Sequence, residues 1–175
     1  MAAAFPIHVW SIILALRDIP WVAERTNIWD AIGVAGYELV FSLLESLLIW
    51  VVAVLFGSLL LRNWSENKRV SVLSVLILVT ILGAICGQYV EIIQLPFSSQ
   101  IGAFLTTKQN PMWFIYGALS VLILPIVLSS AYFAAYSDTC QNVIPAILDR
   151  IAPLMVLYLS LDALGLIMIL IRNFA

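Results

Sequence analysis

Four carboxyl groups stand out in this sequence because they fall inside, or at the edge of, long apolar stretches. They are Glu38, Glu45, Glu91 and Asp162. A charge near the middle of a lipid bilayer costs several kcal/mol, so such residues are by default candidates for function. Burial disfavours the ionised form, and these groups could therefore also serve as neutral hydrogen-bond donors. We find no Lys, Arg or His within the core of a predicted span to pair with them.

Helical spacing adds polar neighbours to these carboxyl groups. Glu38 and Glu45 are two turns apart on one face, with Ser42 between them. We expect a continuous polar seam inside a helix bundle, formed by Glu38, Ser42, Glu45, Thr80, Glu91, Gln94, Tyr158 and Asp162.

Depth along the helices favours two of these residues as the centre of the seam. At a rise of 1.5 Å per residue, Asp162 falls near mid-bilayer and Glu45 about 4–5 Å from it. Glu38 and Glu91 fall roughly 13–15 Å from the centre, on the same side. Glu45 and Asp162 could therefore share a proton or a hard cation, since their ligand atoms are oxygens. The alternative is that the carboxyl groups are neutral and join helices by hydrogen bonds, or contact a partner chain.

Small residues and proline mark where helices should pack or bend. Gly83 and Gly87 have the spacing that lets a neighbouring helix approach closely, and Gly165 shares a face with Asp162. Pro125 is predicted to kink the helix that contains it.

The composition indicates that lipid is the solvent of this chain. Hydrophobic residues make up 63% of the 175 residues and charged residues 10%, whereas soluble domains carry about 25% charged residues. The net charge is −2 and there is no block of basic residues, which excludes nucleic acid as a partner. The expected surroundings are the bilayer and either other membrane subunits or further copies of this chain.

The apolar stretches predict an all-α integral membrane protein, a bundle of four transmembrane helices in a domain covering residues 31–175. The predicted spans are residues 36–61, 70–93, 112–136 and 152–171. Residues 1–30 are predicted to form an amphipathic segment in the membrane interface, with a re-entrant hairpin as the alternative. The apolar run Ile7–Leu16 is about 15 Å long as a helix, half the thickness of the hydrocarbon layer.

The other reactive side chains are few. His8 is the only histidine, and in an interfacial segment it is expected to contact headgroups rather than to catalyse. Cys86 and Cys140 are far apart and form no CxxC motif, so neither a disulfide nor a metal site is expected. No catalytic residue is assigned, and the sequence does not identify a cofactor.

Four spans would place both termini on one face of the membrane. Each face would carry four basic residues: Arg17, Arg25, Lys108 and Arg172 on the terminal face, and Arg62, Lys68, Arg69 and Arg150 on the other. Three of the second set cluster in one short loop close to the helix ends, where the positive-inside effect is strongest. The positive-inside rule then predicts that this face is cytoplasmic and that the termini are non-cytoplasmic.

Three functions are compatible with the sequence. The favoured one is a structural or assembly subunit of a larger membrane complex, because the chain is small and has no catalytic motif. The second is a small oligomeric proton or cation translocator that uses Glu45 and Asp162. The third is a membrane-embedded enzyme acting on a lipid or a quinone.

Overall fold

Helices account for all the regular secondary structure in the described part of the chain. The computed structural model describes residues 2–59, 63–92 and 99–174, without the side chains of residues 90–92 and 99–102. The long helices are α1 (Ala4–Arg25), α2 (Ile28–Leu59), α3 (Glu66–Ile92), α5 (Pro111–Tyr136) and α7 (Leu154–Phe174), and two shorter ones are α4 (Ser99–Thr106) and α6 (Asp138–Ile151). Five of them are long and apolar enough to cross a membrane: α1, α2, α3, α5 and α7. The all-α prediction is confirmed.

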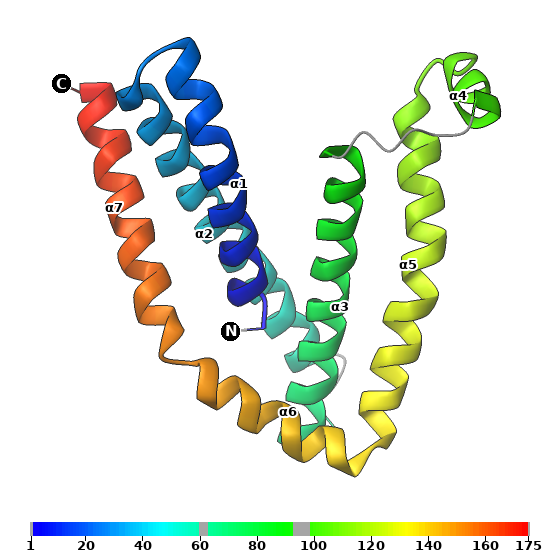
Figure 1. Ribbon diagram of the computed structural model, residues 1–175. Coiled ribbons are helices and arrows are strands. Elements are labelled where there is room, and N and C mark those ends of the chain that lie inside the picture. Colours follow the sequence, from blue (N-terminus) through cyan, green and yellow to red (C-terminus); the bar gives the residue numbers. More distant parts are fainter. Residues whose placement is uncertain (1, 60–62, 93–98, 175) are drawn as a thin grey trace.

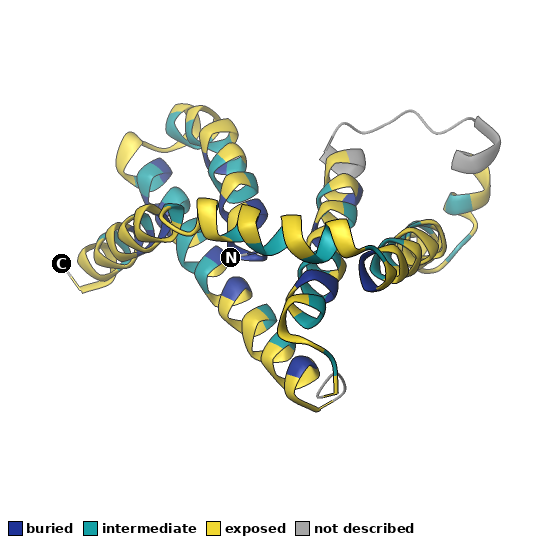
Figure 2. Ribbon diagram, turned by 90° about the horizontal axis from the view of Figure 1, so that it is seen from below, coloured by how far each residue is buried: buried dark blue, intermediate teal, exposed yellow. Residues whose placement is uncertain are grey.

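The helices form two groups that are joined along one end. Helix α2 packs against both α1 and α7, whereas α3 packs mainly against α5 and α6. Figure 1 shows the first group beside the second, with α6 running beneath both and carrying the chain from α5 to α7. Seen from below, α6 crosses the gap between the groups (Figure 2). Contacts between α2 and α3 are few.

The N-terminal helix lies within the predicted interfacial segment, residues 1–30, but is longer than the apolar run Ile7–Leu16. Arg17 and Asp18 end that run, and α1 continues past both to Arg25. These two side chains neutralise one another, with 2.6 Å between Arg17 Nε and Asp18 Oδ1. Helix α1 then lies alongside α2 instead of across its end (Figure 1).

The turn between α1 and α2 carries a side-chain cap. The Asn27 side chain accepts a hydrogen bond from the Asp30 backbone N–H at 2.9 Å and donates one to the Asp30 carboxylate at 2.8 Å. Such caps satisfy backbone donors in the first helical turn. The other Asp30 carboxylate oxygen lies 2.8 Å from Arg172 Nη2, which joins the start of α2 to the end of α7.

Helix α6 precedes the last predicted span. It starts at Asp138, within the polar run of residues 137–142. Ser137 is the N-cap and accepts a hydrogen bond from the Cys140 N–H at 3.3 Å. A polar run that resembles a loop is here a capped first turn, because Ser and Asp both favour helix starts.

Glycines permit the closest helix contacts. A Cβ atom on Gly165 would lie 3.0 Å from the Gly36 carbonyl oxygen, so α2 and α7 touch through their backbones. Gly83 and Gly87 face Ile123 and Leu119, which lie on α5.

Pro125, where a kink is predicted, lies inside a continuous helix. Helix α5 continues through Pro125 as one element from Pro111 to Tyr136.

The contact between Gly36 and Gly165 predicts a specific sensitivity to side-chain size. Gly165→Val should separate α2 from α7 and lower the free energy of unfolding by about 1–3 kcal/mol, the usual cost of overpacking. Gly117→Val is the matched control, since a Cβ at Gly117 would meet nothing within 4 Å. Thermal unfolding of the two variants in mild detergent measures the difference, and equal melting temperatures would contradict the packing.

Candidate functional site

The most deeply buried polar contact joins the first helix to the last. His8 on α1 and Asp162 on α7 are each only 2% exposed. His8 Nε2 lies 3.1 Å from Asp162 Oδ2 and 3.2 Å from Oδ1, so both carboxyl oxygens are within hydrogen-bond distance of the imidazole. Two residues separated by 154 positions therefore form one polar centre.

The hydrogen bonds of the imidazole determine where its protons lie. His8 Nδ1 is 2.8 Å from the carbonyl oxygen of Ala4. A carbonyl can only accept a hydrogen bond, so Nδ1 carries a proton. The contact between Nε2 and Asp162 then contains one further proton, held either by an imidazolium or by a neutral carboxylic acid. Both arrangements have no net charge, which is what apolar surroundings favour.

Tyr158 completes this centre. Its ring stacks on the His8 imidazole with 4.8 Å between ring centroids and 22° between ring planes. Tyr158 and Asp162 are one helical turn apart on α7, so both face α1. The stacked ring holds the imidazole in the plane from which it reaches the carboxyl group.

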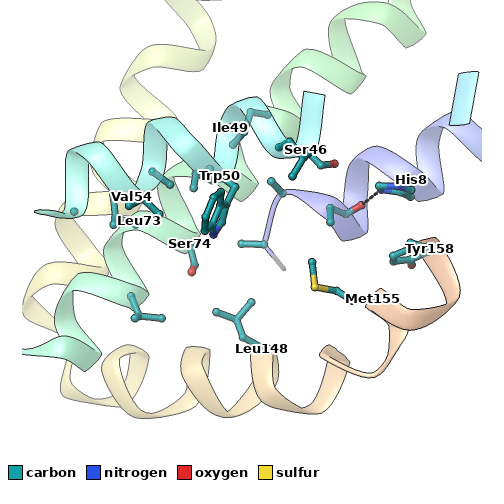
Figure 3. A pocket seen from close by; sticks show the side chains of 18 of the residues that line it. His8, Ser46, Ile49, Trp50, Val54, Leu73, Ser74, Leu148, Met155 and Tyr158 are labelled. Carbon is teal, nitrogen blue, oxygen red and sulfur yellow. Dashed lines mark hydrogen bonds between the residues drawn. The ribbon is translucent and has the colours of Figure 1, made fainter. Parts of the chain in front are cut away.

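A cavity of about 710 Å³ adjoins the His8–Asp162 pair, between the two helix groups. Its walls are mainly apolar side chains of α2, α3, α6 and α7, with Ala2–Ala4 closing one side. Figure 3 shows Trp50 projecting into this space from α2, with Leu148 and Met155 on the far side and His8 above Tyr158 at one end. This volume falls within the range of roughly 300–1,000 Å³ typical of small-molecule sites.

Two hydroxyl groups of the cavity lining lack hydrogen-bond partners. Ser46 on α2 is 9% exposed, and its Oγ is buried without a partner. Ser74 on α3 also lines the cavity and makes no hydrogen bond with the described residues. Hydroxyls in helices usually donate to a carbonyl of the preceding turn, as Ser42 does to Leu39 at 2.7 Å.

The predicted seam is divided among different surroundings. Asp162 is bonded to His8, whereas Glu45 is exposed on the outer side of α2 and makes no hydrogen bond or ion pair with the described residues. Thr80 is also exposed and donates to the Leu76 carbonyl of its own helix at 2.7 Å. The structure therefore does not bring Glu45 and Asp162 into contact.

The remaining seam residues add little to the buried centre. Glu38 is half-buried, and one of its carboxyl oxygens is enclosed without a hydrogen-bond partner. Glu91 belongs to α3, but its side chain is outside the described part of the structure, as is the whole of Gln94. Across the described residues, no group of three or more His, Cys, Asp and Glu side chains could hold a metal ion.

His8 is the site residue that the sequence reasoning did not include. The statement that no base lies within a span depended on treating residues 1–30 as interfacial. Once α1 is a long helix beside α2, its single histidine lies at the depth of Asp162. The available signal was a lone histidine between apolar residues, combined with a carboxyl group that needed a partner.

Comparisons of the chain with protein-family models, with curated proteins and with solved structures give no match. The site geometry alone must therefore support a function.

The His8–Asp162 pair predicts an ordered effect of two substitutions. Asp162→Ala removes the partner of a buried imidazole and should lower the free energy of unfolding by about 1–3 kcal/mol. Asp162→Asn should cost less, because an amide can still donate to Nε2. Asp149→Ala, on the exposed face of α6, is the control. Detergent-phase unfolding curves give the three values, and an Asp162→Ala curve that matched Asp149→Ala would contradict a structural pair.

Proposed function

We propose that this chain is a multi-pass integral membrane protein in which α1, α2, α3, α5 and α7 are all embedded in lipid. Five helices have the necessary length and apolar character. Large apolar side chains point outward from them, for example Leu48 (67% exposed), Val121 (72%) and Val156 (70%). An apolar surface of this extent is suited to lipid rather than to water. This proposal adds α1 to the four spans expected from the sequence.

The proposed topology divides the loops between two faces. The α1–α2 turn, the start of α5 and the end of α7 lie at one end of the helices, opposite the end of α2, the start of α3 and α6 (Figure 1). The first face carries Arg25, Lys108 and Arg172, and the second carries Lys68, Arg69 and Arg150. Because Lys68 and Arg69 are adjacent at the start of α3, close to a helix end where the positive-inside effect is strongest, we assign the second face to the cytoplasm.

Within the membrane, we propose that the chain acts as a subunit of a larger assembly. One observation supports this function above all: Glu45 is exposed and has no hydrogen-bond or ion-pair partner among the described residues. It is 17 residues from Ile28 and 14 from Leu59, the two ends of α2, which corresponds to about 21–25 Å of helix on either side.

The neighbours of Glu45 do not provide a polar environment. Leu44, which precedes Glu45, and Phe41 and Leu48, one turn away on α2, are all exposed and apolar. A carboxyl group facing hydrocarbon from mid-helix costs several kcal/mol. A second chain would remove this cost by offering a hydrogen-bond donor, a base, or another carboxylic acid at the same depth. Glu45 is therefore the proposed contact to a partner subunit.

The topology predicts which of five exposed asparagines are reached from each side. In a variant with Cys86→Ser and Cys140→Ser, single cysteines replace Asn27, Asn110, Asn173, Asn67 or Asn142. A membrane-impermeant maleimide should label positions 27, 110 and 173 in intact cells, and positions 67 and 142 only after permeabilisation. Labelling of 27 and 67 under the same condition would contradict the crossing of α2.

The assembly role predicts that Glu45 controls association. The purified protein should form a defined oligomer or retain a partner in mild detergent, and Glu45→Leu should weaken that association about 3–30-fold, as expected for loss of one interhelical hydrogen bond. Glu24→Leu, at the exposed end of α1, should leave it unchanged. Native mass spectrometry measures both, and a monomer without any co-purifying protein would count decisively against the role.

A further inference from the structure

The cavity between the helix groups combines three features that the assembly role does not use. It has apolar walls, an aromatic side chain that enters the space, and hydroxyl groups that have no partner among the described residues. Ser46 and Trp50 of α2 line this cavity, whereas Glu45 of the same helix is exposed and does not. The two inferences are therefore independent.

Ser46 supplies the evidence for a polar ligand atom. Its hydroxyl is enclosed yet makes no hydrogen bond, whereas Ser42, Ser58 and Ser160 each donate to a carbonyl of their own helix. A buried donor without an acceptor is costly and rare. Because Ser46 lines the cavity, rotation about χ1 would turn this enclosed oxygen toward it. A ligand that presents an acceptor oxygen there would then remove that cost.

The surroundings of Ser46 favour a ligand whose polar group is uncharged. The His8–Asp162 pair at this end of the cavity already has its donors and acceptors in mutual contact and no net charge. A charged group placed here would have no compensating partner. Arg69 also lines the cavity, but it lies beside Gly57 and Ser58, at the end away from the His8–Asp162 pair.

Trp50 favours a ligand whose polar group is part of a planar ring. Its indole stands in the cavity (Figure 3), and planar π-systems stack favourably on aromatic rings. The remaining space is lined by aliphatic residues such as Val54, Leu73 and Leu148, which suit a hydrocarbon tail.

We propose that this cavity binds a lipid-soluble quinone, with a carbonyl oxygen accepting the Ser46 hydroxyl and the ring against Trp50. A quinone head is planar, uncharged and has only acceptor oxygens, so it matches each of these features. Ser74 is a second donor available to the ligand, since its hydroxyl also lines the cavity without a partner. The tail follows the apolar walls between α2 and α3.

The test is a titration of the purified full-length protein in mild detergent with decylubiquinone. Saturable quenching of tryptophan fluorescence is expected, and Trp50→Phe should remove most of the amplitude. Ser46→Ala should raise the Kd about 2–12-fold, the value for loss of one hydrogen bond. Ser160→Ala is the matched control, because that hydroxyl is exposed and bonded within α7; it should leave the Kd unchanged.

A second variant and a competitor make the outcome decisive. Ala53→Phe places a ring in the cavity and should abolish quenching while the helical circular dichroism and melting temperature stay close to those of the parent. Non-saturable quenching, or equal Kd values in Ser46→Ala and Ser160→Ala, would overturn the proposal. So would displacement of decylubiquinone by phosphatidylglycerol at lower concentration with dependence on Arg69→Gln, since the occupant would then be an anionic lipid.

Discussion

The buried contact between His8 and Asp162 is the constraint around which the first group of helices is arranged. A carboxyl group enclosed by apolar side chains must find a partner, and the partner here lies on the first helix of the chain. Meeting this requirement holds α1 against α7, while Gly36 and Gly165 hold α2 against α7 through their backbones. The Asp30–Arg172 ion pair fixes the opposite end of α2 and α7. Three helices are thus joined by a polar centre, a backbone contact and a terminal ion pair.

The second group of helices is held differently, and this difference creates the cavity. Helices α3 and α5 meet through Gly83 and Gly87 against branched aliphatic side chains, and Ser71 on α3 donates to the Cys140 carbonyl of α6 at 3.3 Å. Few contacts join α2 to α3, so the groups remain apart above α6. The space between them is bounded by the His8–Asp162 centre on one side and by α3 on the other. Both proposals follow from unsatisfied polar groups: Glu45 faces outward toward a partner chain, and Ser46 faces inward toward a ligand.

The surroundings of a side chain on α2 depend on the direction in which it leaves the helix. Glu45 and Ser46 are neighbours in sequence, but one is exposed and the other buried, because successive residues of a helix point about 100° apart. Spacing alone predicted that Glu38, Ser42 and Glu45 share one face of their helix. Spacing within one helix does not say what that face contacts. Whether that face meets another helix, a cavity or the outside depends on how α2 is rotated against α1 and α7. For this reason the seam predicted around Glu45 and Asp162 is not one cluster in the structure.

The sequence by itself determined the all-α class, the apolar helices and several of their ends, because hydrophobic length and capping residues act locally. Asn27 caps α2 and Pro111 begins α5, and Asp162 stood out as a carboxyl group from its apolar context alone. The tertiary structure decided which partner Asp162 has, since His8 is 154 residues away and no local pattern connects them. It also decided that α1 packs along α2, whereas the pairing of Arg17 with Asp18 inside α1 is local. Local chemistry sets which segments become helices, whereas long-range packing sets which polar groups meet.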